Sequence, residues 1–371
     1  MRHSLGLRRV FVIPLALAAC LAANGTGSAA PPGGSGEKTR IEFAQRYRAL
    51  QHGGIVRAAN SAITCRRAID RTAESCARTR GGRPGVNDDF DMFYIDVDDD
   101  PNTYNSSTGE VRLPAHSRVS YARLYWGGNL RVGEQKPPKD NGRVLIAEPG
   151  GNYKAVVADT PVGHRVVKGA DGADAFQASA DVTDLVRSAG GGAYTVAQVN
   201  VAMGHSRAGA WGGWTLVVAY ENAAEPLRTL AVWDGFDSTG ENGHRHAVRL
   251  RGVPRGTDGI AGVVAYDGDR GRRGDTVAVS SRRTGSVPLT DAANPAGDAL
   301  NSTISEPGTP LRRNPAYANT LGYDSDVFPL PKGPDRPADG RRGPRGDLTV
   351  HLASQDPAWV GVVFAAVDAK R

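Results

Sequence analysis

The sequence lacks three features that would assign it to a familiar class. The apolar run at residues 10–23 stops short of the about 20 residues that a membrane-spanning helix needs. Arginines are scattered among aspartates, and the net charge of +6 falls to +3 without the three arginines of the first 30 residues, so no nucleic-acid partner is expected. No LPxTG-type motif precedes the C-terminal segment, so wall anchoring through that end is not encoded.

The first thirty residues have the three parts of a secretory signal peptide. Two arginines close a positive segment, residues 10–23 form the apolar run, and small residues follow it. Cleavage after Ala29 makes residues 1–29 the signal and predicts a secreted, extracellular protein. The alternative is a lipobox, Leu17-Ala18-Ala19-Cys20, in which Cys20 carries a lipid that anchors the protein to a membrane.

Cysteine is scarce, with three in the whole chain. Cys65 and Cys76 are the pair that remains once Cys20 is removed or lipidated. In an oxidising compartment such a pair predicts a disulfide that closes a short loop. A tetrahedral zinc site would need two more ligands, and no histidine or third cysteine lies near the pair.

Turn-forming residues are abundant, with 47 glycines and 23 prolines. Between the turns the chain alternates polar and apolar residues and shows almost no sustained helical periodicity. This predicts an all-β fold, an antiparallel β-sandwich resembling a jelly roll, with long Gly/Pro-rich loops. Strands are expected within residues 54–64, 90–97, 119–126, 144–147, 155–158, 194–201, 214–220, 230–233, 247–250, 260–266, 276–280, 348–352 and 359–367, and a short helix at 181–187.

Shifts in composition divide this expected fold. Residues 30–42 predict a flexible leader, because glycine, proline and polar residues dominate them. Residues 43–235 predict a first sandwich lobe that contains the disulfide loop, and residues 236–371 a second lobe. Within the second lobe, residues 291–346 are poor in apolar residues and predict a long, mobile loop.

Two motifs resemble catalytic or metal-binding patterns, but the residues around them do not fit those patterns. Gly204-His205-Ser206-Arg207-Ala208 resembles a nucleophile elbow, but it ends in alanine and a strand, not a helix, is expected to follow. His244 and His246 could present two imidazoles on one strand face, yet no third ligand follows them. No catalytic residue is assigned, and Ser206 with the histidines supports only a less favoured secreted hydrolase.

The strongest candidate site is an acidic segment at the end of an expected strand. Asp96, Asp98 and Asp100 alternate before a proline turn, which can direct their carboxylates towards a hard cation such as Ca²⁺. The segment is not an EF-hand loop, because proline stands where that loop requires glycine. A solvated acidic turn is the alternative interpretation. Asp267-Gly268-Asp269 and Asp324-Ser325-Asp326 carry the same two interpretations.

Aromatic side chains offer a second candidate site, a carbohydrate platform. Aromatic residues within strands more often belong to the core, and Trp211, which lies in a glycine-rich segment, is the one expected to be exposed. The five candidates are Tyr125, Trp126, Trp211, Trp214 and Trp233.

Several stretches occur together in a characteristic order. They are Asp91-Met92-Phe93-Tyr94-Ile95-Asp96-Val97-Asp98, Arg123-Leu124-Tyr125-Trp126-Gly127-Gly128, residues 213–220, Trp233-Asp234-Gly235-Phe236, Tyr266-Asp267-Gly268-Asp269-Arg270-Gly271 and Leu321-Gly322-Tyr323-Asp324-Ser325-Asp326. Over roughly residues 43–368 this set resembles an uncharacterised module of actinobacterial secreted and surface proteins, often found ahead of β-sandwich repeats and a cell-wall sorting signal. The resemblance implies an all-β extracellular module and carries over no catalytic residue. This chain lacks the repeats and the sorting signal.

These observations favour a non-enzymatic secreted or envelope-associated module with an interaction or structural role. Its expected partner is a cell-wall polymer or another surface protein. The alternative is a carbohydrate-binding jelly roll, which Ca²⁺ could stabilise. No other cofactor is expected, and no sequence feature identifies the ligand.

We predict that the mature protein begins at Ala30 or carries a lipid on Cys20, because the first thirty residues are read as an export signal. Intact-mass spectrometry and N-terminal sequencing of the protein from its producing cells test this. A cytoplasmic chain that retains Met1 would contradict export.

Overall fold

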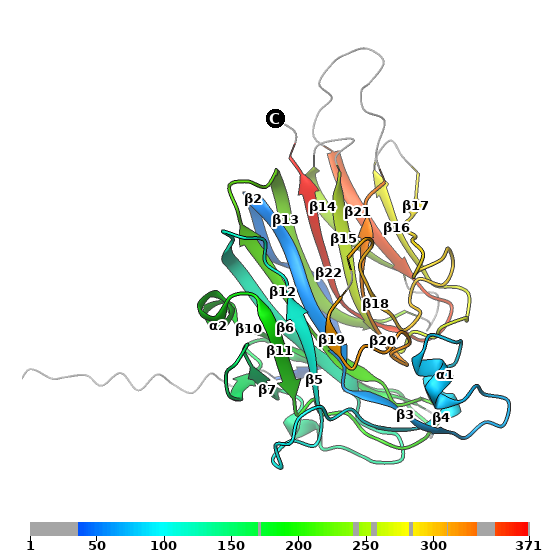
Figure 1. Ribbon diagram of the computed structural model, residues 1–371. Helices are drawn as coiled ribbons and strands as arrows, with labels where there is room; N and C mark the ends of the chain where they lie inside the picture. Colours follow the sequence, from blue (N-terminus) through cyan, green and yellow to red (C-terminus); the bar gives the residue numbers. More distant parts are fainter. Residues whose placement is uncertain are drawn as a thin grey trace, which may run out of the picture. The chain divides into compact units, whose positions relative to one another are not determined.

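The computed structural model describes residues 36–169, 172–239, 245–253, 258–281, 285–309, 311–331 and 346–369, all within one compact unit. The expected signal peptide 1–29 with Cys20, the expected leader up to residue 35, His244 and residues 332–345 lie outside the described residues. The described chain is mostly β-strand, in several antiparallel sheets, which confirms the all-β prediction (Figure 1). No described helix is long and apolar enough to cross a membrane.

Eleven strands of the described residues form one large sheet. Neighbours are antiparallel except β1 with β9 and β18 with β20, which are parallel. The order is β1 (Glu37–Lys38), β9 (Val162–Val166), β10 (Asp174–Asp181), β6 (Arg118–Asn129), β12 (Gly212–Glu221), β2 (Ile41–Ser61), β13 (Leu227–Ser238), β22 (Trp359–Asp368), β15 (Gly259–Tyr266), β20 (Tyr323–Pro329) and β18 (Ile304–Ser305).

Three smaller sheets and four short helices complete the described elements. The five-stranded sheet is β19 (Arg313–Asn314), β5 (Ser106–Val111), β11 (Gly192–Ala197), β7 (Arg143–Ala147) and β8 (Lys154–Val157). The four-stranded sheet is β14 (Arg245–Val253), β21 (Gly346–Ala353), β16 (Thr276–Ser281) and β17 (Val287–Pro288), and the hairpin is β3 (Ile63–Ala68) with β4 (Phe90–Tyr94). The helices are α1 (Cys76–Arg80), α2 (Thr183–Ala189) and the 3₁₀ turns η1 (Asn87–Asp89) and η2 (Pro138–Asp140).

The central strands of the large sheet are buried on both faces. In β6, Leu124 and Trp126 belong to one apolar cluster, whereas Tyr121 and Tyr125 belong to another. Successive side chains of a strand point to opposite faces, so apolar residues at consecutive positions require cover on both sides. The polar–apolar alternation expected from the sequence is therefore weak in residues 119–126 and 214–220, where apolar residues occupy consecutive positions.

Three apolar clusters provide that cover. The first cluster combines residues of the five-stranded sheet, such as Ile146, with residues of β12, such as Leu216. The second combines residues of the four-stranded sheet, such as Val350, with residues of β22, such as Val363. The third cluster lies where the large sheet folds back on itself. Tyr323 of β20 and Thr215 of β12 are distant in strand order, yet their hydroxyls are 2.7 Å apart.

The lobe boundary expected between residues 235 and 236 lies inside a strand. β13 continues through it from Leu227 to Ser238 and pairs with β2 on one side and β22 on the other. The first cluster comes from residues 58–218, with Leu321 added, and the second from residues 231–367. The third mixes residues from both parts of the chain, so the two sandwiches share one sheet.

Two segments expected to be loose contain strands. The expected leader 30–42 includes β1, which pairs with β9, and the first residues of β2. The expected mobile loop 291–346 includes β18, β19 and β20, and β20 is buried from Tyr323 to Phe328 between β15 and β18. The composition of both segments predicted flexible chain, because few of their residues are apolar. They form strands because they pair with strands that are far away in the sequence.

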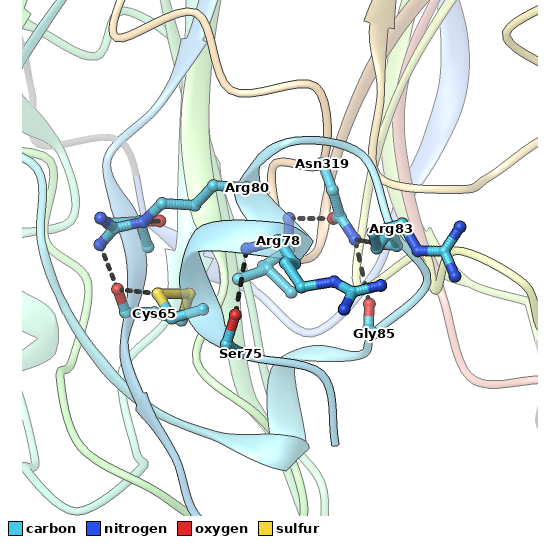
Figure 2. The surroundings of a disulfide bond; sticks show 10 residues. Cys65, Ser75, Arg78, Arg80, Arg83, Gly85 and Asn319 are labelled. Atoms are coloured by element: carbon cyan, nitrogen blue, oxygen red, sulfur yellow. Dashed lines mark hydrogen bonds between the residues drawn. A yellow bond between two sulfur atoms is a disulfide. The ribbon is translucent and has the colours of Figure 1, made fainter. Parts of the chain in front are cut away.

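The Cys65–Cys76 disulfide is present, with the two Cα atoms 5.7 Å apart, which confirms the predicted pair. It joins β3 to the first residue of α1 (Figure 2). Ser75 caps α1, its hydroxyl accepting from the Arg78 backbone N–H (3.4 Å). Nearby, the Asn319 side chain donates to the Gly85 carbonyl (3.1 Å), which ties this loop to the segment before β20.

We predict that Leu216→Ala, in the first cluster, and Val363→Ala, in the second, each lower the midpoint of one common unfolding transition. Leu→Ala in a packed core costs about 2–5 kcal/mol, and Val→Ala less. Chemical denaturation followed by tryptophan fluorescence and far-ultraviolet dichroism tests this. Two transitions, each shifted by only one of the variants, would restore two independent lobes.

Candidate functional site

The acidic turn at 96–100 directly follows β4, as expected, but the protein supplies its own donors to each carboxylate. Ser106 donates its hydroxyl hydrogen to Asp96 (2.8 Å), and Thr103 does the same to Asp98 (3.0 Å). Asp100 accepts two N–H hydrogen bonds from the residue two positions on (2.9 and 2.7 Å). No three His, Cys, Asp or Glu side chains of the described chain lie close enough to hold a metal together. The structure therefore adds no support for Ca²⁺ at this turn.

The five aromatic candidates form no platform. Tyr125, Trp126 and Trp214 are fully buried, and Trp233 is 5% exposed. Trp211 is fully buried too, so the expectation that it is exposed is wrong. Its ring packs 5.9 Å from that of Tyr266, in the third cluster.

The nucleophile candidates do not assemble a catalytic set. Ser206 Oγ is buried without a hydrogen-bond partner, and the adjacent His205 ring contacts the Asp88 backbone oxygen (2.9 Å) instead. A second serine–histidine pair joins β16 to β21, with Ser280 Oγ 2.6 Å from His351 Nε2. Within the described residues no carboxylate hydrogen-bonds to that imidazole, so nothing orients it as a general base.

The groups that do converge are carboxylates at the end of β15. They line a pocket of about 180 Å³, formed where η1, the turn after β15 and the turn before β22 meet. Its acids are Asp88, Asp267, Asp269 and Asp356, and its other charged residues are Arg207 and Arg272. Asn87, Val167, Gly172, Ala173, Ala208, Ser238, Pro357 and Trp359 complete the wall.

The local fold after β15 places two of these acids. Asp267 has a φ of 64°, in the left-handed region that Asp and Asn tolerate better than most residues, and its N–H donates to the Gly322 carbonyl (2.8 Å). Gly268 is required by space, because a Cβ there would lie 2.3 Å from Asp324 Oδ2 and 2.6 Å from the Leu300 oxygen. The sequence Asp-Gly-Asp thus turns tightly beneath β20.

Burial dominates the electrostatics of this pocket. It raises the pKa of Asp269 to about 7 and holds that of Asp267 well above its usual range, with the neighbouring carboxylates adding to both shifts. Burial also raises the pKa of Asp88. Two contacts oppose these shifts: Arg272 Nε lies 3.4 Å from Asp269, and Asn87 donates to Asp267 (3.0 Å). Around pH 7 the pocket is therefore poised between proton-bearing and ionised states.

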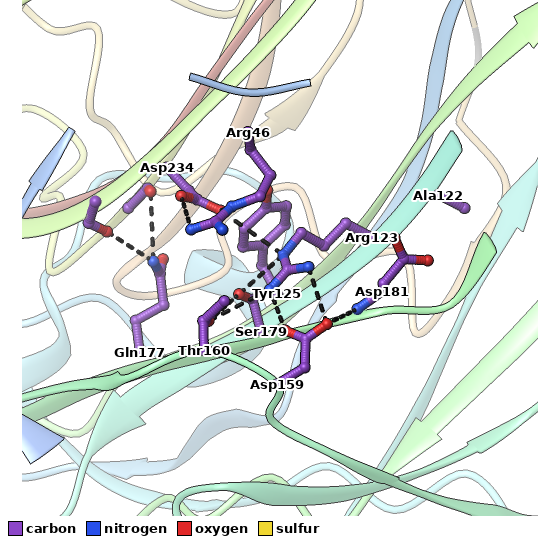
Figure 3. A network of polar contacts seen from close by, with 12 residues as sticks. Arg46, Ala122, Arg123, Tyr125, Asp159, Thr160, Gln177, Ser179, Asp181 and Asp234 are labelled. Atoms are coloured by element: carbon purple, nitrogen blue, oxygen red, sulfur yellow. Dashed lines mark hydrogen bonds and ion pairs between the residues drawn. The ribbon is translucent and has the colours of Figure 1, made fainter. Parts of the chain in front are cut away.

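In a second polar cluster of the same fold, acids are paired with arginines (Figure 3). Arg46 binds Asp234 through two hydrogen bonds of 2.8 Å, and Tyr125 adds a third donor. Arg123, which is 3% exposed, pairs with Asp159 across the strand edge. Asp234 and Asp159 thus each pair with a guanidinium group.

The sequence pointed to part of the pocket. Asp267 and Asp269 are among the cation candidates that the sequence offers, with a solvated turn as the alternative interpretation. Asp356 and Arg272 carried no signal, since neither belongs to a motif and only the fold of β15 and β22 brings them together.

Comparison with known proteins adds little beyond the fold. Neither a protein-family model nor a curated protein matches the sequence. A structure of Sulfolobus Turreted Icosahedral Virus matches 85% of this chain and 91% of its own, at 9% identity and a TM-score of 0.21. The crystal structure of the STIV MCP matches 70% of this chain and 91% of its own, at 10% identity and a TM-score of 0.21. Likeness this distant carries no functional argument.

We predict that stability falls as pH rises from 5 to 8 in the presence of a chelator. A carboxyl whose folded-state pKa is raised adds stability below its unfolded pKa and loses it as pH rises through the folded value, about 7 for Asp269, Asp275 and Asp326. Thermal unfolding at fixed ionic strength measures this. Asp269→Asn should flatten the decline, whereas Asp99→Asn, on the exposed turn, should not. A Tm that is flat or rising over this range would contradict the prediction.

Proposed function

We propose that this chain is an exported, non-enzymatic recognition module whose acid-lined pocket receives a primary ammonium group of its partner. The observation that supports this best is the gathering of four aspartates around one small pocket with only two arginines. If all are ionised, the wall carries two negative charges in excess. An ammonium group, a compact cation with three donors, matches that excess in charge and in hydrogen bonding.

The pocket is large enough for the end group of a ligand but too small for a whole ligand. At about 180 Å³ it is smaller than the ~300–1,000 Å³ of typical small-molecule sites. Its apolar wall, which includes Pro357 and Trp359, suits the methylene stem that precedes an amine. Amines on stems of this kind occur in lysine side chains of surface proteins and in cell-wall polymers, the two partners expected for an extracellular module.

Recognition is favoured over catalysis and over a sugar platform. Ser206, the serine proposed from the sequence as a nucleophile, has no histidine partner. The tryptophans considered as stacking surfaces are buried. Export is supported by the signal-like first thirty residues, and the extracellular role by the resemblance to secreted actinobacterial modules.

We predict that Nα-acetyl-lysine methylamide binds to the full chain, whereas its uncharged isostere Nα-acetyl-norleucine methylamide does not. Binding should tighten several-fold from pH 5.5 to pH 8, because deprotonating Asp269 adds negative charge that attracts the ammonium group. Titration calorimetry measures both effects.

A matched pair of variants locates the site. Asp269→Asn should weaken binding at least about tenfold, the loss of one charge-assisted hydrogen bond, whereas Asp99→Asn on the exposed turn should not change it. Equal binding of the norleucine compound, or an unchanged affinity in Asp269→Asn, would sink the proposal.

A further inference from the structure

Asp324 and Asp326 form a second acidic feature, deeper than the pocket. They alternate along β20 with Tyr323, Ser325 and Val327; Tyr323 and Val327 belong to the third cluster, and Ser325 bonds to Thr215 beside them. The two aspartates therefore face the other side, under residues 289–305. Each is only 1% exposed.

One oxygen of each carboxylate has no partner. Asp324 accepts from the Thr303 backbone N–H through Oδ1 (3.1 Å), and its Oδ2 is buried and unpartnered. Asp326 accepts three hydrogen bonds through Oδ1, from the Thr303 hydroxyl (3.0 Å) and from Ser305 (2.9 and 2.7 Å). Its Oδ2 is also buried and unpartnered. Leaving such oxygens without a donor or a counter-ion is unfavourable, and more so for ionised groups.

The neutral groups around them present more oxygens than hydrogens. The single hydroxyl hydrogen of Thr303 faces three acceptors: Asp326 Oδ1 (3.0 Å), Asn294 Oδ1 (2.9 Å) and Asn301 Oδ1 (2.8 Å). Both amide groups are fixed in this orientation, because Asn294 Nδ2 donates to Ser305 and Asn301 Nδ2 to the Ala293 carbonyl (2.8 Å each). At most one of the three acceptors can receive that hydrogen.

Basic side chains are near but do not neutralise the pair directly. Arg57, Arg270 and Arg313 act on Asp326 at longer range, and Asp275 adds negative charge near Asp324. Within the described chain no ion pair of 4 Å or less joins a basic group to either carboxylate. Arg57 instead donates to the Ser305 carbonyl (2.6 Å).

We propose that the oxygens of Asp324, Asp326, Asn294, Asn301 and Thr303 form a structural Ca²⁺ site inside the fold. Ca²⁺ accepts six to eight oxygen ligands and tolerates a mixture of carboxylate, amide and hydroxyl donors, whereas Mg²⁺ requires an octahedron and retains water. Neighbouring side-chain oxygens in and around the site lie 2.7–3.0 Å apart, and there are too few hydrogens to bridge all of them. A bound cation would reduce the repulsion between these oxygens. The proposed site contains two carboxylates, and its other ligands are the neutral side-chain oxygens of two asparagines and a threonine.

The site differs from the pocket in location and in ligand. It lies beneath β20 and contains none of the pocket's residues, and its occupant is a bare cation that stabilises the fold, not a partner's end group.

The test is Ca²⁺ binding by the full chain after chelator treatment. Calorimetry should show one Ca²⁺ per chain, with Mg²⁺ at least tenfold weaker, and saturating Ca²⁺ should raise the Tm by about 5 °C. Asp326→Asn should abolish both effects, whereas Asp98→Asn, in the acidic turn, should retain them. In chelator at pH 8, Asp326→Asn should melt above the wild type, because it removes an uncompensated buried charge.

A second variant keeps the test decisive if Asp326→Asn does not fold. Asn301→Asp adds a third carboxylate to the cage and should tighten Ca²⁺ binding while lowering the Tm in chelator. No Ca²⁺ binding by the wild type, binding that survives in Asp326→Asn, or binding lost in Asp98→Asn or Asp269→Asn instead would overturn the proposal. Loss of the lysine-compound affinity in Asp269→Asn with Ca²⁺ binding intact would show that the two sites are separate.

Discussion

Burial of both faces of the large sheet is the constraint on which the rest of the structure depends. A strand such as β12 carries Leu216 and Val218 towards one cluster and Val217 and Ala219 towards another, so neither face can be left to water. The five-stranded and four-stranded sheets cover the outer faces, and the fold-back of the large sheet covers the inner one. Each of the two sandwiches is incomplete without the strands they share, which is why β13 passes through the boundary that composition suggests.

The same constraint produces the acidic interior. Once the large sheet folds back, the segments that close its β15–β20 end must be buried although their sequences are polar. At the β13 end the fold meets that requirement with guanidinium–carboxylate pairs such as Arg46 with Asp234 (Figure 3). At the β20 end the carboxylates of Asp324 and Asp326 lie among amide and hydroxyl oxygens. The first arrangement is complete in itself, whereas the second calls for protons or a cation from outside.

The two acidic sites that we propose differ in their physical character. The pocket after β15, which we propose binds an ammonium group, has four aspartates and two arginines in its wall, and this suits selective and reversible recognition. The Asp324–Asp326 cage is closed, which suits a permanent structural ion. Gly268 connects them, since any side chain there would collide with Asp324 beneath β20 while its neighbours Asp267 and Asp269 face the pocket. Occupation of the cage should therefore hold the turn that shapes the pocket.

Much of the fold could be predicted from the sequence, because buried strands leave a clear record. The runs that became β6, β12 and β22 were recognisable, and the scarcity of cysteine left Cys65 and Cys76 as the disulfide. Segments whose environment depends on distant strands could not be predicted. β20 reads as a polar turn because Asp324 and Asp326 interrupt its apolar residues, and only pairing with β15 makes it a buried strand. Trp211 reads as exposed because glycines surround it in the sequence, yet its ring is fully buried and packs beside that of Tyr266.

The acid-lined pocket and the proposed Ca²⁺ site were harder to predict from the sequence than the strands. An acidic run in sequence reports charge density, whereas a cation site depends on the lack of competing donors, which no local pattern records. The 96–100 turn has the densest acids and also the most donors, from Ser106 and Thr103 among others. Asp326 has one neighbouring acid and an oxygen that nothing in the described chain satisfies.

The central claim is that this fold buries carboxylates that its own cations do not neutralise. Infrared difference spectroscopy tests it most directly, because a protonated carboxylic acid has a carbonyl stretch distinct from that of a carboxylate. In chelator near pH 6 we predict a band from buried, protonated aspartates that becomes weaker when Ca²⁺ is added at constant pH, and that loses this Ca²⁺-dependent part in Asp326→Asn. A spectrum at pH 6 in which every aspartate is already ionised without Ca²⁺ would contradict the account.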